Sequence, residues 1–142
     1  MPSSGKSLVV GRHLDRSRQF LAVALALVPV TLGAYELYLH STLGCSFSFP
    51  FHVGLTVVGL TAFHAYRNDG LLVCWALGVG PTFGFELYFY VLAFGHRNLW
   101  WGVVNAVTNL SIVVALVLAT VGFLGGAGLR RAVEFAGVRV PV

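Results

Sequence analysis

The amino-acid sequence predicts an all-α, polytopic membrane protein built as a bundle of four transmembrane helices. Three observations predict this fold class: the scarcity of charge, the length of the apolar runs and the position of the basic residues. Of the 142 residues, 57% are hydrophobic and only 10% are charged, whereas a soluble domain usually has about a quarter charged residues. So few charged side chains cannot cover a water-facing surface, and we therefore expect the chain to lie in hydrocarbon.

Four apolar runs are long enough to cross a bilayer, which takes about 20 residues at 1.5 Å each. Because backbone polar groups in lipid must pair within their own segment, we expect these runs to be helices rather than strands. Together they form a transmembrane domain at 19–126, between a basic N-terminal segment at 1–18 and a basic tail at 127–142 that rests on anionic headgroups. The four spans cover about residues 20–39, 49–66, 71–94 and 99–124.

The basic residues lie at the ends of the apolar runs and mostly on one side of the predicted bundle. With four spans both termini share that side, which holds Lys6, Arg12, Arg16, Arg18, Arg67, Arg130, Arg131 and Arg139. The opposite side holds only Arg97. The positive-inside rule therefore predicts a protein of the cell membrane with both termini in the cytoplasm. Basic residues confined to helix ends also argue against a nucleic-acid partner.

Two GxxxG pairs predict close helix contacts, because small residues let helix backbones approach each other in lipid. Gly80 and Gly84 form one pair in the third span, and Gly122 and Gly126 form the other near the end of the fourth. Packing within one chain is the favoured interpretation, and dimerisation is the alternative.

A short pattern recurs after 50 residues. Residues 34–39 and 84–89 both read small, aromatic, Glu, Leu, Tyr and apolar. The match suggests a duplicated helical hairpin, with two parallel copies related by an axis along the membrane normal. Chance similarity within a sequence of few residue types is the alternative.

Glu36 and Glu86 are the only acidic residues inside the predicted spans. An ionised carboxylate in the bilayer interior costs at least a few kcal/mol, so such a residue needs a reason. Glu36 lies near the outer end of its run, where contact with the interface would explain it. Glu86 lies about 12 Å inside the third span, where a protonated side chain hydrogen-bonded to a neighbour is the structural alternative.

Folding each hairpin about its outer connection predicts which groups share a depth with the two glutamates. Glu86 falls level with Asn105 and Asn109, which lie four residues apart on one helical face, and Glu36 falls level with His52. An Asn side chain can donate to a carboxylate or accept from a carboxylic acid. We therefore expect a polar layer in which these five residues are candidates for binding an ion or a proton.

A transition-metal site is a further hypothesis for the outer end of the bundle. Glu36, His40 and His52 would be its ligands, since His40 follows Glu36 by one helical turn and carboxylate and imidazole groups are common metal ligands. The spacing matches no recognised metal motif, and histidines that simply lie at the membrane interface are the competing explanation.

A carboxyl at depth with polar neighbours favours a small proton- or cation-linked protein of the transport or channel type. We expect it to act as a homo-oligomer, because four helices enclose little room for a pathway. The alternative is a non-catalytic membrane anchor or assembly subunit that joins partner membrane subunits and binds a quinone or a haem. The sequence has no nucleophile beside a base and no phosphate-binding loop, so we expect no catalytic residues.

Overall fold

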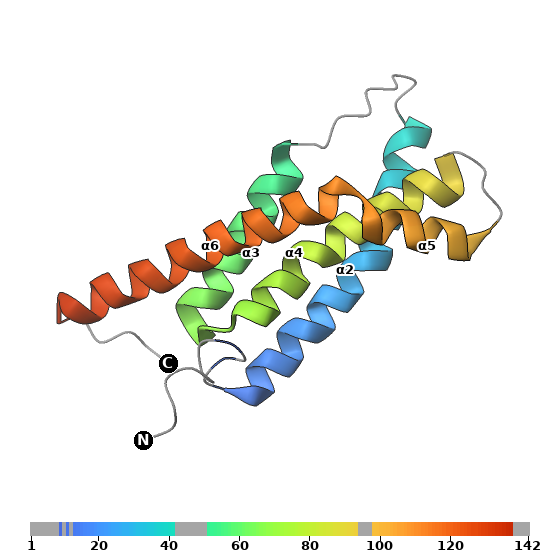
Figure 1. The fold of residues 1–142 in the computed structure, drawn as a ribbon. Coiled ribbons are helices and arrows are strands. Elements are labelled where there is room, and N and C mark those ends of the chain that lie inside the picture. The colour runs from blue at the N-terminus through green and yellow to red at the C-terminus, as the bar shows by residue number, and fades with distance from the viewer. Residues whose placement is uncertain (1–8, 10, 12, 42–50, 94–97, 138–142) are drawn as a thin grey trace.

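The computed structural model describes residues 9, 11, 13–41, 51–93 and 98–137 of the chain (Figure 1). Every regular element within these ranges is a helix, which confirms the predicted all-α class for this part of the chain. Three helices are long and apolar enough to cross a membrane: Leu14–Leu37, Leu71–Val91 and Leu110–Phe135. Many of their large apolar side chains point outward, as expected for a protein whose solvent is lipid.

The first two long helices are α2 (Leu14–Ser41) and α3 (Phe51–Asn68). At 28 residues, α2 is about 42 Å long, which exceeds the hydrocarbon thickness of about 30 Å. α3 is shorter and contains two histidines and Arg67. It is not one of the three helices that are long and apolar enough to cross a membrane. The number of crossings therefore stays a prediction.

A tight turn joins α3 to α4 (Leu71–Leu87). Asp69 adopts a left-handed backbone conformation with φ 53°, which Asp and Asn tolerate better than most residues. Gly70 then precedes the first turn of α4. Beyond Leu87, the helix continues as a π-helical segment, η1 (Tyr88–Ala93).

The predicted fourth span at 99–124 is not one helix, and the prediction is wrong on this point. The structure has α5 (Leu99–Thr108) and α6 (Leu110–Phe135), separated at Asn109. The backbone of Asn109 is extended, with φ −72° and ψ 147°, and its side-chain oxygen accepts a hydrogen bond from the backbone N–H of Ser111. Asn109 is thus the N-cap of a new helix, a position that Asn strongly favours. α6 also continues eleven residues past the predicted end.

α4 is the central helix of the bundle, with α2 along one side and α3 and α6 along the other (Figure 1). α2 and α4 run in the same direction, and so do α3 and α6, with one pair antiparallel to the other (Figure 1). The beginning of α2, the turn between α3 and α4, and the end of α6 gather at one end of the bundle. This is the inner end of the bundle, and the opposite end is the outer end.

Both GxxxG pairs make contacts within the chain. A Cβ added to Gly80 would collide with the backbone oxygen of Ala24 on α2, and one added to Gly84 with that of Val28. Gly126 approaches Ala62 of α3 in the same way. Gly122 similarly faces α3. The glycines therefore seat α4 on α2 and α6 on α3, as the interpretation of packing within one chain expects.

The helix pairing differs from the two hairpins expected from the sequence. α2 and α3 touch only slightly, and their main partners are α4 and α6 respectively. Helices that the proposed repeat would make equivalent thus lie side by side, but the repeat itself stays a prediction. The predicted match in depth between Glu36 and His52 stays a prediction.

Candidate functional site

Glu86 lies at the end of α4 with only 4% of its surface exposed. Both of its carboxyl oxygens accept a hydrogen bond from the region where α5 ends and α6 begins. The amide nitrogen of Asn109 donates to Oε2 over 2.9 Å. The hydroxyl of Ser111 donates to Oε1 over 2.5 Å. A buried carboxyl is therefore held by two side chains that belong to one helix break.

Asn109 is the residue that connects this carboxyl to the backbone. Its oxygen caps α6 by accepting from Ser111 N over 3.3 Å. Its amide nitrogen donates both to Glu86 and, over 3.2 Å, to the hydroxyl oxygen of Tyr90. Since one side chain serves the cap, the carboxyl and the tyrosine, the break in the helix and the polar site depend on each other.

Backbone irregularities meet at Glu86 from two sides. The π-helical segment η1 begins two residues after it and contains Tyr90. The extended residue Asn109 interrupts the opposite helix at the same level. Short π-helical segments occur frequently at functional sites. The first residues of α6 also face the carboxyl, since Ser111 near the N-terminus of this helix donates to it.

The donors around Glu86 can serve both forms of the carboxyl. The Asn109 amide nitrogen only donates, whereas the Ser111 hydroxyl can either donate or accept. An ionised Glu86 receives both hydrogen bonds as they stand. A proton placed on Oε1 would be accepted by the Ser111 oxygen after rotation of the hydroxyl, with Asn109 still donating to Oε2. The site can therefore hold or release a proton without losing a hydrogen bond.

Asn105, which the sequence places at the same depth as Glu86, makes a hydrogen bond within α5 instead of one to the carboxyl. Its amide nitrogen donates to Trp101 O over 2.8 Å, one turn earlier in α5. The prediction assumed one continuous helical face through both asparagines, and the break at Asn109 ends that face. Conversely, Ser111 and Tyr90 contact the site although no sequence pattern pointed to them. The sequence signal for Ser111 would have been a hydroxyl or amide side chain within three residues of the asparagine that ends a helix.

Glu36 is half-buried on α2 and has its own partner in η1. Its carboxyl forms a side-chain hydrogen bond with Tyr88. The side chains of His40 and His52 lie outside the described residues, so their predicted place beside Glu36 and the proposed metal site are not tested. Among the residues that are described, no three His, Cys, Asp or Glu side chains gather closely enough to hold a metal ion.

A second polar cluster lies at the inner end, where sequence reasoning expected a tail on headgroups. Arg130 of α6 is only 7% exposed. Its guanidinium lies 2.8 Å from Glu134 and 3.7 Å from Asp69, and it donates to Tyr66 O over 3.3 Å. Asp69 in the α3–α4 turn was the sequence signal for this cluster, because a buried arginine requires an opposite charge.

Asn68 fastens the start of α2 to this inner end. Its oxygen accepts from His13 N over 2.8 Å, and its nitrogen donates to Ser17 Oγ over 2.9 Å. His64, one turn earlier, is fully buried with its ring edge against Phe20 at 4.4 Å between centroids. Within the part of the chain that the structure describes, neither ring nitrogen of His64 has a hydrogen-bond partner. The ring thus packs as an apolar group.

Comparisons with protein-family models, with curated proteins and with solved structures found no match to this chain.

Proposed function

We propose that this chain is a small proton- or cation-linked membrane protein of the transport or channel type, with Glu86 as the binding group. One observation carries the proposal: a buried carboxyl lies between a π-helical segment and a helix break, and both of its oxygens are hydrogen-bonded to that break. Ionisable groups inside membrane proteins commonly mark ion and proton pathways. Interrupted helices whose ends face the site are a recurring arrangement in transporters.

The exchange of one proton at Oε1 is the step that this geometry supports best. In the ionised form Ser111 donates to Glu86, and in the protonated form Glu86 donates to Ser111. Protonation removes the charge of the carboxyl and reverses its hydrogen bond with Ser111. The contact between α4 and the start of α6 therefore changes with the protonation of Glu86.

The surrounding arrangement is part of the same proposal. Both termini lie in the cytoplasm, because the basic residues concentrate at the end of the bundle where α2 begins and α6 ends. The protein acts as a homo-oligomer, since one bundle of this size leaves little room for a pathway. Glu36, together with Tyr88, forms a related group nearer the outer end. This group donates protons to Glu86 or accepts protons from it.

Proton flux in reconstituted vesicles tests the role of Glu86. The full chain is placed in vesicles that contain a trapped pH-sensitive dye, and a potassium gradient with valinomycin sets the potential. We expect wild-type protein to carry protons, and Glu86→Gln to reduce the flux to that of protein-free vesicles. Glu134→Gln is the matched control, because it makes the same chemical change at an exposed side chain of the inner end and should leave the flux intact.

Two results would contradict the proposal. One is an unchanged flux with an unchanged pH dependence in Glu86→Gln. The other is wild-type protein that carries neither protons nor, when tested with an internal sodium indicator, sodium ions above the background of empty vesicles.

A membrane anchor or assembly subunit is the second candidate, and one observation favours it. The hydrogen bonds of Glu86 are satisfied inside the bundle, as expected for a carboxyl that only ties α4 to α6. Purification from native membranes separates the two candidates. Companion proteins together with a quinone, or with the absorption band of a haem, favour the anchor. A colourless homo-oligomer without companions favours transport.

A further inference from the structure

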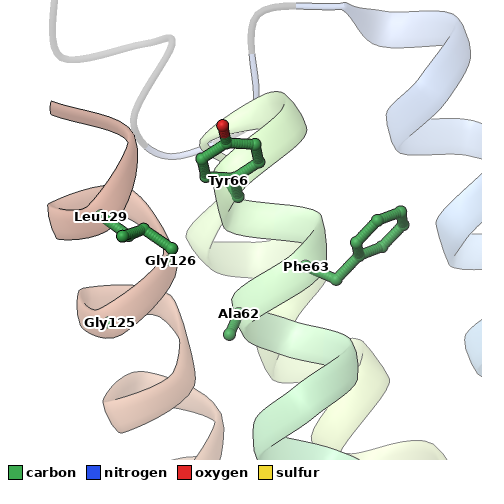
Figure 2. A pocket seen from close by; sticks show the side chains of 6 residues that line it. All are labelled: Ala62, Phe63, Tyr66, Gly125, Gly126 and Leu129. Atoms are coloured by element: carbon green, nitrogen blue, oxygen red, sulfur yellow. The ribbon is translucent and has the colours of Figure 1, made fainter. Parts of the chain in front are cut away.

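His64 places a completely buried imidazole ring in the inner half of α3. None of its surface is exposed, and in the part of the chain that the structure describes neither ring nitrogen has a hydrogen-bond partner. Figure 2 shows this part of α3 beside α6, where Ala62 and Tyr66 line an apolar groove between the two helices. His64 is two residues from each of them and therefore lies about 160° away around the helix. Its ring points away from the groove and contacts Phe20 of α2.

A layer of hydrogen bonds separates this ring from the inner end. Asn68, one turn further along α3, accepts from His13 N just before α2 and donates to Ser17 Oγ of α2. Gly11 packs against the same group, since a Cβ there would lie 2.7 Å from Asn68 Nδ2 and 2.8 Å from Ser17 Oγ. The start of α2 thus closes over α3 at Asn68. The contact between His64 and Phe20 lies one turn deeper, behind this layer.

The charges around the ring offer little support for a proton on it. Asp69 is the acidic residue that would attract a charged His64, but its carboxylate lies 3.7 Å from the Arg130 guanidinium. A charged ring would therefore compete with Arg130 for Asp69. The other ionisable side chains that are buried or half-buried on the inner halves of these helices are Arg16 of α2, Arg67 of α3 and Cys74 of α4, whereas His13, Asp15 and Arg18 are exposed. The protonated ring would thus join a region in which most of the charges are already positive.

We propose that His64 is a proton-operated latch of the inner end. In its neutral form the ring fills the space between α2 and α3 and the start of α2 stays closed over Asn68. In its charged form the ring requires water or a carboxylate partner, because an ionised group buried without one is far more costly than a neutral group. Protonation therefore separates the segment from Gly11 to Phe20 from α3 and lets water reach the ring. Histidine is the side chain that changes charge close to neutral pH.

The direction of the pH dependence follows from the two states of the latch. The closed state holds the ring neutral, whereas in the open state the exposed imidazole takes up a proton near pH 6.5. Opening is thus independent of pH well above this value and increases as the pH falls below it. The equilibrium constant for opening should be about 30-fold larger at pH 5 than at pH 8. This behaviour does not depend on Glu86, which lies toward the outer end.

Hydrogen exchange of the full chain in lipid nanodiscs tests the latch, since amide exchange reports local opening. Protection factors at pH 5 and pH 8, corrected for the intrinsic exchange rates, are compared for segments 13–20 and 61–69 and for segment 82–91 near Glu86. We expect protection of the two inner segments to fall about 30-fold at pH 5. Protection of segment 82–91 should change much less.

Two substitutions assign the effect to one ring. His64→Phe keeps an aromatic ring that cannot be protonated, so protection of the inner segments should no longer depend on pH. His13→Gln is the matched control, because it removes a histidine whose side chain is exposed at the same end, and it should respond to pH as the wild type does. His64→Leu replaces His64→Phe if that variant does not fold, with the same expected result.

Four results would overturn the proposal. One is wild-type protection of the inner segments that is equal at pH 5 and pH 8. The second is an equal loss of protection at both ends, which would show a general effect of acid. The third is a loss that persists in both His64→Phe and His64→Leu. The fourth is a loss that disappears in His13→Gln, which would assign the response to the exposed histidine.

Discussion

The side chain of Asn109 makes three hydrogen bonds, and each has a different consequence. Its oxygen caps α6 at Ser111 N, and its nitrogen donates to Glu86 and to Tyr90. The sequence placed Asn109 at the depth of Glu86 because both residues lie a similar, small number of residues from the connection between the third and fourth predicted spans. The same reasoning placed Asn105 at this depth too, but it could not show that Asn109 would end a helix and that Asn105 would donate within α5.

Asn109→Ala should destabilise the protein more than Asn105→Ala. Loss of the cap costs about 1 kcal/mol, and loss of the donor to a buried carboxyl costs about 1–3 kcal/mol more. Asn105 donates only to its own helix, so its replacement should cost less than about 1 kcal/mol. Thermal unfolding in lipid nanodiscs measures both variants. Equal melting temperatures would contradict the proposed double role of Asn109.

At the scale of the elements, apolar length predicted where the long helices lie, but not where they break. Residues 99–124 are mostly apolar and contain two asparagines, Asn105 and Asn109, and an asparagine within such a run is not a strong stop signal. The outcome was decided by a tertiary contact, since the Asn109 side chain is held by Glu86 of another helix. The π-helical form of η1 has no sequence pattern that would have predicted it.

The helix pairing depends on glycine, and Gly126→Ala tests this. A Cβ at Gly126 would collide with the Ala62 backbone oxygen, so α6 must move away from α3, and overpacking of this kind costs about 1–3 kcal/mol. Gly128→Ala adds the same methyl group where nothing lies within 4 Å, and should be neutral or slightly stabilising through helix propensity. Thermal unfolding compares the two variants. A Gly126→Ala protein as stable as Gly128→Ala would contradict the close approach of α6 to α3.

At the scale of the whole molecule, the two ends of the bundle have different polar chemistry. The outer half holds the carboxyls of Glu86 and Glu36 with hydroxyl and amide partners. At the inner end, Arg130 of α6 forms an ion pair with Asp69 of the α3–α4 turn and donates a hydrogen bond to Tyr66 O near the end of α3. Composition and charge position predicted an all-helical membrane chain with this basic end. They could not predict that Arg130 turns inward, because the sequence places it beside Arg131 in a segment that resembles a surface tail.

The buried pair of Asp69 and Arg130 should therefore hold the inner end closed, and a double-mutant cycle measures this. Asp69→Asn keeps the left-handed turn, which Asn also tolerates, but leaves the buried guanidinium without its partner in the turn. Removal of one member of a buried pair typically costs about 3–5 kcal/mol, although Glu134 still faces Arg130 and places the expected loss at the lower end. Arg130→Gln should destabilise similarly, and the double variant should lose less than the two single losses combined, because neither charge is then left uncompensated. Glu134→Gln is the control and should cost less than Asp69→Asn, because the Glu134 side chain is 44% exposed whereas that of Asp69 is 6% exposed. Strictly additive losses in thermal unfolding would show that Asp69 and Arg130 do not stabilise each other.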